Sequence, residues 1–246
     1  MLVRTLTEEL FQPMRLYYTI NDTVQLRENL RKLKCVDYNS ELDDWTLRYE
    51  VEASDIRLKI PPHKVSAKAQ PLIIATIYLE SNEMLIDVRS IERAARIIEF
   101  IDKHIPRNTV KITYAAIYNK LITAPSNHPE SVRDIDYDDI FSEQRMITID
   151  PEKHISNMES IASQCKNKQK AMEVISQETQ ELSKRPLPEV EKMPIYYYEE
   201  GIGHFETACR FRQAIAIQHY LGKKDYSFYD LTQELLYKSK DLEWNT

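Results

Sequence analysis

The histidines and cysteines, the side chains best suited to metal binding and nucleophilic catalysis, are scattered along this sequence. The six histidines are His63, His104, His128, His154, His204 and His219. None belongs to an HExxH or Glu-x-x-His pattern, which would place metal ligands on one helical face. The three cysteines, Cys35, Cys165 and Cys209, form no CxxC pair of the kind found in zinc ribbons and thiol redox sites. We therefore expect no metal centre and no cysteine nucleophile.

An acidic run formed by Asp134, Asp136, Asp138 and Asp139 is superficially similar to a calcium-binding loop. Such a loop requires glycine at its sixth position and a bidentate glutamate at its twelfth. Asp139 and Arg145 occupy those positions here. The run is therefore interpreted as a solvated acidic loop.

The densest set of side chains suited to binding lies in residues 196–220. This segment combines three consecutive tyrosines with two glycines, two histidines and two arginines. Tyrosine and arginine are enriched in protein interfaces, which makes the segment a candidate recognition surface. The predicted binding residues are Tyr196, Tyr197, Tyr198, His204, Glu206, Arg210 and Arg212.

A structural role for the same segment is the main alternative. Its apolar residues are distributed around nearly the whole predicted helix, which is typical of a helix packed on several sides. Glu206 and Arg210 are i,i+4 neighbours that can form an ion pair on the helix. Arg210 or Arg212 would form a buried ion pair with an acid such as Glu199 or Glu200. A catalytic pocket in this segment is the third interpretation.

Glycine usage excludes one large class of sites. The chain has only three glycines, Gly201, Gly203 and Gly222, so residues 1–200 contain none. Loops that bind phosphate through the backbone need glycine, because a Cβ blocks the close approach or the positive φ. A Walker loop and a Rossmann fingerprint are thereby excluded, and no cofactor is predicted.

The elements that would position these residues begin with an N-terminal α+β region. Alternating apolar residues predict strands at 14–20, 45–51, 56–60, 72–80 and 84–88, the last two as a hairpin. A 3.6-residue period predicts one helix after Asp22 and a long one from Ser90 to Ile105. The resulting β-α-β-β-β-β-α order predicts a curved antiparallel sheet packed on the long helix. Residues 110–122 fit either a strand or a helix.

The remainder of the chain is predicted to be mostly helical. Residues 151–184 fit a helical hairpin or one long helix with a weak turn. A further helix is expected from about His204 to Leu221, ended by Gly222, and Ser227 is expected to cap the last helix. The loop signals near Pro125 place a domain boundary there. We therefore predict a sheet domain at 1–122, a linker at 123–135 and a helical domain at 136–246.

Charge and hydropathy narrow the expected partners and location. Residues 1–122 hold 18 basic and 17 acidic side chains, and the rest hold 15 and 22. Neither part has the basic surplus typical of proteins that bind duplex DNA. No stretch approaches the roughly 20 apolar residues of a membrane span, and the N-terminus lacks the pattern of a secretion signal. A cytoplasmic location without a membrane partner is expected.

These observations favour a non-catalytic interaction or regulatory protein that binds a protein partner or self-associates. The alternative is a protein that binds single-stranded or structured nucleic acid, which the charge disfavours. Its support comes from side chains expected on or near strands: Tyr17, Tyr18, Arg48, Arg57, Lys59 and Tyr78. A small-molecule enzyme with its site near residues 196–212 is the third hypothesis.

Overall fold

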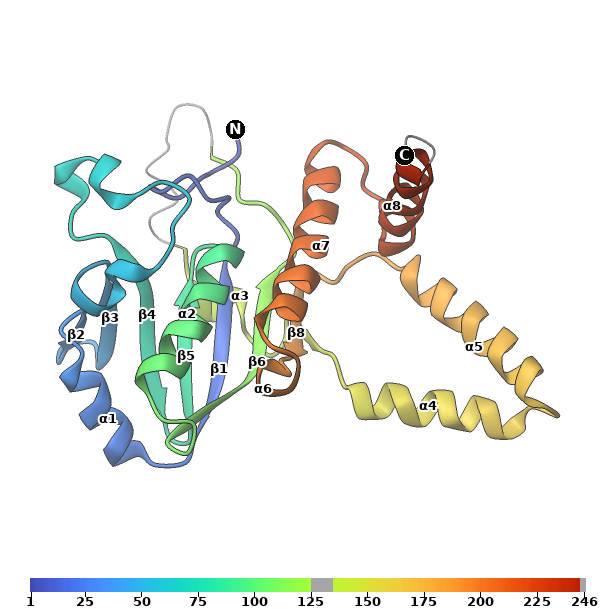
Figure 1. The fold of residues 1–246 in the computed structure, drawn as a ribbon, viewed down its shortest axis with the longest axis horizontal. Helices are drawn as coiled ribbons and strands as arrows, with labels where there is room; N and C mark the ends of the chain where they lie inside the picture. Colours follow the sequence, from blue (N-terminus) through green and yellow to red (C-terminus); the bar gives the residue numbers. More distant parts are fainter. Residues whose placement is uncertain (125–134, 244–246) are drawn as a thin grey trace.

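The computed structural model describes residues 1–124 and 135–243, and within them eight strands form one sheet (Figure 1). The strands lie in the order β2-β3-β4-β5-β1-β6-β8-β7. All neighbours are antiparallel except β7 and β8, which run parallel. The strands are β1 Met14–Ile20, β2 Val36–Asn39, β3 Asp44–Arg48, β4 Ile73–Glu80, β5 Glu83–Val88, β6 Val110–Tyr118, β7 Met146–Thr148 and β8 Val190–Pro194.

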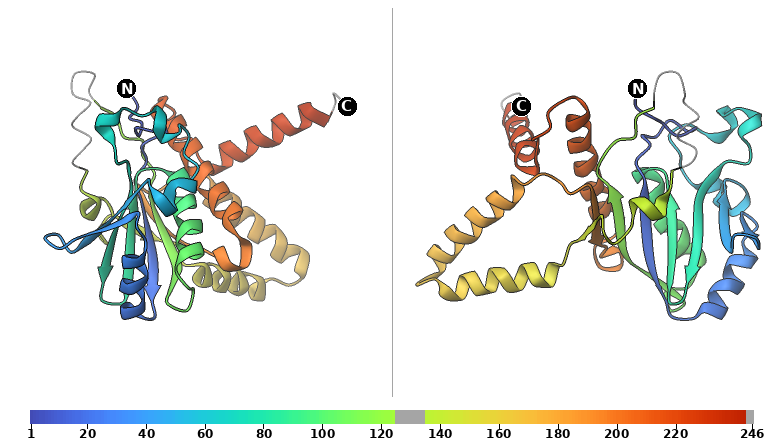
Figure 2. Two further views of the ribbon diagram at one scale, coloured as in Figure 1. Left: turned by 60° about the vertical axis from the view of Figure 1, so that its left-hand side comes forward. Right: turned by 180° about the vertical axis from the view of Figure 1, so that it is seen from behind.

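Helices cover the two faces of this sheet unequally. The helices are α1 Thr23–Lys32, α2 Ile91–His104, α3 Tyr137–Ile140, α4 Pro151–Gln164, α5 Lys168–Ser183, α6 Tyr197–Glu200, α7 Ile202–Tyr220 and α8 Phe228–Glu243. Helices α1, α2 and α7 pack on one face and enclose the main apolar core with it. The short α3 packs on the other face through a smaller cluster (Figure 2). The predicted α+β class, with a mostly helical C-terminal part, is confirmed.

The N-terminal order of elements also follows the prediction. The hairpin of β4 and β5 is antiparallel with Leu79 opposite Met84, and α2 lies across the sheet. Ser90 caps α2 by accepting a hydrogen bond from the Arg93 N–H. Asp22 caps α1 in the same way, accepting from the Gln25 N–H. Local capping and periodicity therefore define both helices correctly.

One predicted strand is wrong, because residues 56–60 form no strand. Ile56 and Leu58 pack against the core, while two N–H groups of the segment donate to Glu9 and to the carbonyl oxygen of Thr7. The alternation arises because this coil crosses the rim of the core, not because it pairs with a strand. In the N-terminal part, the edge strand β2 was not predicted, because it buries only one of its four residues and so shows no alternation.

Residues 110–118 of the ambiguous segment form strand β6. A β-bulge at Tyr17 and Tyr18 shifts the register between β1 and β6, so that Ile112 and Ala115 both face the main core. This irregularity disturbs the two-residue period and explains why the sequence also suggested a helix.

The chain after residue 135 adds two strands to the same sheet, β7 before and β8 after the helices α4 and α5. Strand β8 pairs with β6, and β7 pairs with β8 at the edge. Neither strand was predicted from the sequence, because both are short and because β8 is preceded by Pro188 and ends at Pro194. Residues 125–134 of the predicted linker at 123–135 lie outside the described residues, as does Asp134 of the acidic run. The other three residues of that run do not form a loop, because Asp136 caps α3 and Asp138 and Asp139 lie in its first turn.

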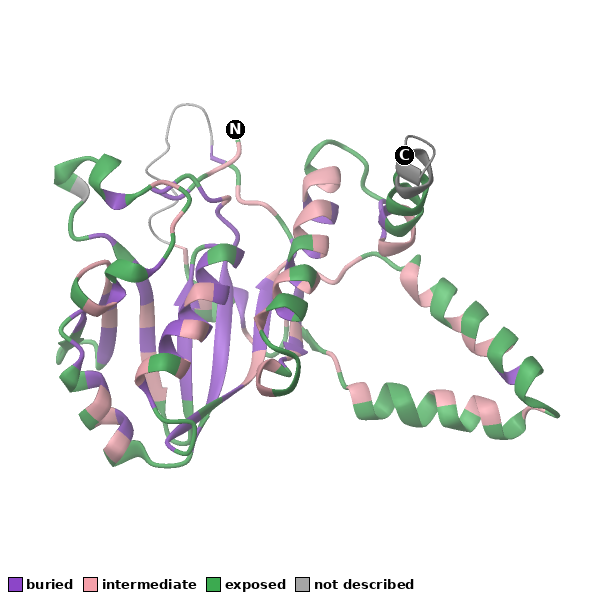
Figure 3. Ribbon diagram, viewed as in Figure 1, coloured by how far each residue is buried: buried purple, intermediate pink, exposed green. Residues whose placement is uncertain are grey.

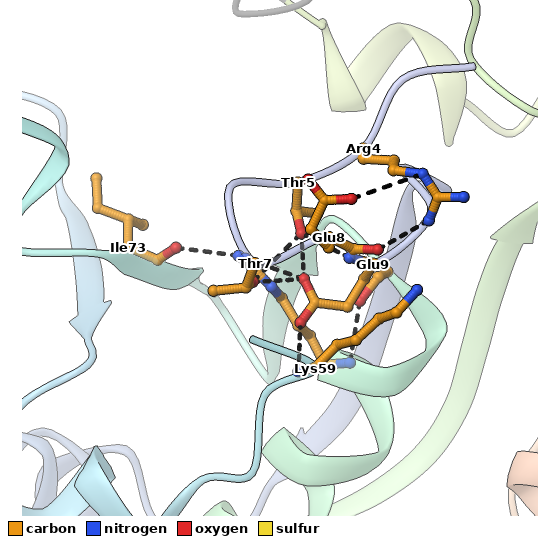
Figure 4. A network of polar contacts seen from close by, with 9 residues as sticks. Arg4, Thr5, Thr7, Glu8, Glu9, Lys59 and Ile73 are labelled. Carbon is orange, nitrogen blue, oxygen red and sulfur yellow. Dashed lines mark hydrogen bonds and ion pairs between the residues drawn. The ribbon is translucent and has the colours of Figure 1, made fainter. Parts of the chain in front are cut away.

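A buried polar cluster fastens the N-terminal segment to the sheet and to α2 (Figure 4). Glu9 is 1% exposed, and its carboxylate accepts hydrogen bonds from the hydroxyls of Thr5 and Thr7. The Arg93 guanidinium, also 1% exposed, lies 3.5 Å from this carboxylate and donates to Thr7 and to the carbonyl oxygen of Ile73. Buried charges are tolerated when they are paired and hydrogen-bonded, so this cluster is a structural tie.

Candidate interaction surface

Two of the three consecutive tyrosines at the start of the predicted binding segment are engaged inside the molecule. The Tyr197 hydroxyl lies 3.4 Å from the Asp102 carboxylate of α2, and the Tyr198 hydroxyl accepts a hydrogen bond from the Ile112 N–H. The Arg107 guanidinium lies 4.6 Å from the centre of the Tyr198 ring. Tyr196 stays 47% exposed. Tyr197 and Tyr198 thus hold α6 against α2 and β6.

The charged residues of α7 divide between an internal contact and the surface. The Glu206 carboxylate lies 3.1 Å from the Arg96 guanidinium of α2, which ties the two helices together. Arg210 approaches the same carboxylate only at 4.0 Å and is 68% exposed at its side chain. His204 is exposed. The structure therefore places Tyr196, His204 and Arg210 at the surface and the other predicted residues at internal contacts.

Arg212 forms the buried ion pair expected in this segment, but with a different acid. Its Nε lies 2.5 Å from Glu191 of β8, and the two residues are 8% and 6% exposed. The expected partners Glu199 and Glu200 are both exposed, because Gly201 at φ +75° separates α6 from α7 and directs them outward. Glu191 was not predicted as the partner, because it lies on strand β8, which the sequence did not reveal. The pair fastens α7 to the sheet.

Helices α4 and α5 extend away from this body and have almost no core of their own (Figures 1 and 3). None of residues 151–164 is buried, and among residues 168–183 only Ala171 is. Ile155 and Met172 are 56% and 62% exposed. The predicted helical hairpin is present, yet helices of this length are marginal in water without tertiary packing.

Helix α8 is attached to the body at its beginning. Leu231 packs with Ile215 and Tyr226, and Ser227 and Asp230 cap the helix reciprocally, as expected for Ser227. Residues 232–238 are all exposed. They include three large apolar side chains, Leu235, Leu236 and Tyr237, which are 44%, 56% and 70% exposed. The helix leaves the body as a rod (Figure 2).

We call α4, α5 and residues 228–238 of α8 the helical arm. Helices α4 and α5 meet at their connected ends and diverge toward the body (Figure 1). A cleft of about 820 Å³ lies between the diverging ends. Its lining is mostly polar and includes Lys153 and His154 of α4, Glu178 of α5 and Arg185 just beyond α5, with Leu182 of α5 as an apolar side chain. The arm thus combines exposed apolar side chains with a concave, mostly polar surface.

The side chains that supported nucleic-acid binding do not share one surface. Tyr17 and Tyr78 lie on the α3 face of the sheet, whereas Tyr18 packs into the main core on the other face. Arg57 and Lys59 lie in the coil before β4. The sequence could not separate these positions, because facing depends on strand register.

Tyr17 on the α3 face is already covered by a basic side chain. The Lys192 ammonium lies 3.7 Å from the centre of the Tyr17 ring and 5.2 Å from that of Tyr114. Tyr17 is only 6% exposed. Burial lowers the pKa of Lys192, which is consistent with an ammonium group packed between two rings. A base stacking on Tyr17 would first have to displace this lysine.

A second cleft, of about 570 Å³, borders the predicted site near Tyr196. Its polar lining includes Lys111, Asp150, Glu152 and Glu199, and no histidine contributes to it within the described residues. The combination of converging acid and histidine that would favour an enzyme is therefore not found in the described part of this cleft.

Within residues 1–124 and 135–243, no group of three or more potential ligands among His, Cys, Asp and Glu is close enough to hold a metal ion. None of the described helices combines the length and apolarity that crossing a bilayer requires. Comparison of the chain with protein families, with curated proteins and with solved structures finds no match.

Proposed function

We propose that the protein is a non-catalytic interaction protein, in which the sheet and its covering helices carry the helical arm to a protein partner. The observation that supports this proposal most directly is the contrast in burial along the chain. The helices on the sheet bury continuous apolar faces, whereas α4 and α5 together bury only Ala171 among residues 151–164 and 168–183.

The exposed apolar side chains of the arm supply a driving force for binding. Fully burying a Leu, Ile or Met side chain contributes about 1.5–3 kcal/mol. Ile155, Met172 and Leu235 are each more than 40% exposed, so a partner that covers them gains much of this energy. Binding would also replace the missing tertiary packing of marginal helices.

The proposal is tested by placing a charge on the arm and comparing partner capture. The unaltered chain is expected to capture a protein partner by cross-linking in extracts of its own cells. The chain carrying Ile155→Asp and Met172→Asp should no longer capture that partner. Val24→Asp is the matched control, because Val24 is 71% exposed on α1 of the body. Circular dichroism verifies that each variant is folded. Equal capture by the arm variant and the control would refute the proposal.

A further inference from the structure

The helical arm contains two surfaces that complement each other but do not meet within one chain. One is the exposed side of α8, and the other is the cleft between α4 and α5. Helix α8 begins beside the end of α5, where the Lys184 ammonium lies 5.4 Å from the Tyr229 ring. From there α8 and the α4–α5 hairpin leave the body in different directions in all views (Figures 1 and 2). The α8 of one chain therefore points away from its own cleft.

We infer that the occupant of the cleft is α8 of a second copy of this chain, inserted reciprocally in a two-fold dimer. This inference rests on the proposed function and names the partner of the same arm. A two-fold arrangement is closed, because each chain gives one helix and receives one. Specific interfaces bury at least about 1,200 Å² of accessible surface in total. Because the contact between α8 and the cleft forms twice in the dimer, each of the two contacts needs to bury only about 600 Å².

The dimensions of the helices fit this arrangement. Helices α5 and α8 each have 16 residues, which corresponds to about 24 Å, and α4 with 14 residues measures about 21 Å. The inserted helix would complete a three-helix unit. Leu235 of α8 would lie against the apolar side chain of Leu182, which lines the cleft.

Charge determines the direction of the inserted helix. Along the chain, an acid precedes a base in both partners, Glu178 before Arg185 in the cleft and Glu234 before Lys238 on α8. An antiparallel α8 therefore places Glu234 beside Arg185 and Lys238 beside Glu178. The two spacings differ by three residues, or about 4.5 Å, which these long side chains can span. A parallel helix would bring like charges together.

Among the ion pairs between described side chains, none involves Glu178, Arg185, Glu234 or Lys238. The Glu234 carboxylate does lie near the Tyr226 hydroxyl of its own chain, where it adds to the effect of burial in raising the pKa of that hydroxyl. Electrostatic complementarity mainly sets specificity and orientation, while the apolar contacts supply most of the affinity.

Sedimentation velocity of the full chain over a wide range of concentrations tests the inference. We expect a species of twice the 29.1 kDa chain mass. Glu234→Arg and Arg185→Glu should each weaken the dimer about tenfold or more, because each creates a like-charge contact. The chain with both substitutions should regain the dimer, which also shows that neither change merely prevents folding. Glu28→Arg, on the exposed side of α1, is the control and should leave the dimer unchanged.

Three results would overturn the inference. They are a monomer at every concentration, a dimer insensitive to both single substitutions, and single effects without recovery in the double variant. A monomer that still captures another protein through Ile155 and Met172 leaves the proposed function standing and removes only the second copy as occupant. A monomer that captures nothing removes both.

Discussion

Helices α2 and α5 use the same local signals but have different surroundings. Both begin with a side-chain cap, Ser90 accepting from the Arg93 N–H and Asn167 accepting from the Lys170 N–H. Helix α2 nevertheless buries eight of its 14 residues against the sheet, and α5 buries one of its 16. Capping and periodicity therefore specify where a helix forms, but not whether anything covers its apolar side.

The same contrast separates the whole body from the whole arm. The body joins distant segments through buried pairs such as Arg212 with Glu191 and Arg93 with Glu9. In the arm, the ion pairs among the described residues of α4, α5 and α8 are exposed pairs one helical turn apart. Exposed pairs of that kind contribute about 0–1 kcal/mol. Stability is thus expected to reside in the body and binding in the arm.

The largest expected difference concerns the three thiols, one in the arm and two in the body. Burial raises the pKa of Cys35 and of Cys209 to about 12, from an ordinary value of 9.0. This lowers their reactive thiolate fraction about a thousandfold. Cys165 lies at the end of α4 and is half-buried. Labelling of the native chain with iodoacetamide should modify Cys165 first, and Cys165→Ser should remove the fast phase. A fast phase that survives this substitution would contradict the comparison.

The next largest effect concerns the arginines of α7. Arg212→Ala should destabilise the protein by about 3–5 kcal/mol, because it leaves Glu191 buried without its partner. Arg210→Ala removes a 68% exposed side chain and should cost less than about 1 kcal/mol. Urea unfolding followed by circular dichroism measures both. Equal costs would show that the Arg212–Glu191 pair does not fasten α7 to the sheet.

A matched pair of apolar truncations compares the two regions directly. Ile98 on α2 is 1% exposed, so Ile98→Ala should cost about 3 kcal/mol. Ile155 on α4 is 56% exposed, and Ile155→Ala should change stability by no more than about 0.5 kcal/mol. Both are measured by unfolding of dilute protein, where association contributes least. A large cost at Ile155 would mean that the arm has a core of its own.

The smallest expected effect is the pH dependence of the cluster around Glu9. Burial would raise the pKa of Glu9, but the hydrogen bonds from Thr5 and Thr7 and the charge of Arg93 together lower it below 4.5. Because its pKa is lowered in the folded state, the Glu9 carboxylate stabilises the protein at pH values above about 4.5. This stabilisation is lost as the pH falls through the lowered pKa. Glu9→Gln should therefore reduce stability at pH 7 and flatten its decline in acid. Parallel pH profiles for the two chains would contradict this assignment.

Much of the fold could be predicted because its signals are local. The β4–β5 hairpin, the Ser90 cap and the helix that Gly222 ends all follow from neighbouring residues. The strand predictions fail where strand register or contacts with distant segments determine the structure. The alternation at 56–60 arises at the rim of the core. Strand β8 forms because β6 offers it an edge, and β7 forms because β8 in turn offers it one.

The candidate site was less accessible to prediction for the same reason. The sequence singled out residues 196–212 by composition, and most of their contacts are with α2, β6 and β8. The sequence predicted the helices of the arm, but nothing in it indicated that their side chains would stay exposed. Ile155 in α4 and Ile98 in α2 occupy similar positions in similar helical patterns, yet only Ile98 is buried.

The sequence by itself determined the class of the fold, the caps and ends of most helices, and the absence of a glycine loop for phosphate. These depend on residues within a few positions of each other or on composition. Only the tertiary structure decided that Arg212 pairs with Glu191, that Lys192 covers Tyr17, and that the arm stays exposed. Those outcomes depend on which distant surfaces meet, because burial is a property of packed neighbours and not of the pattern along one chain.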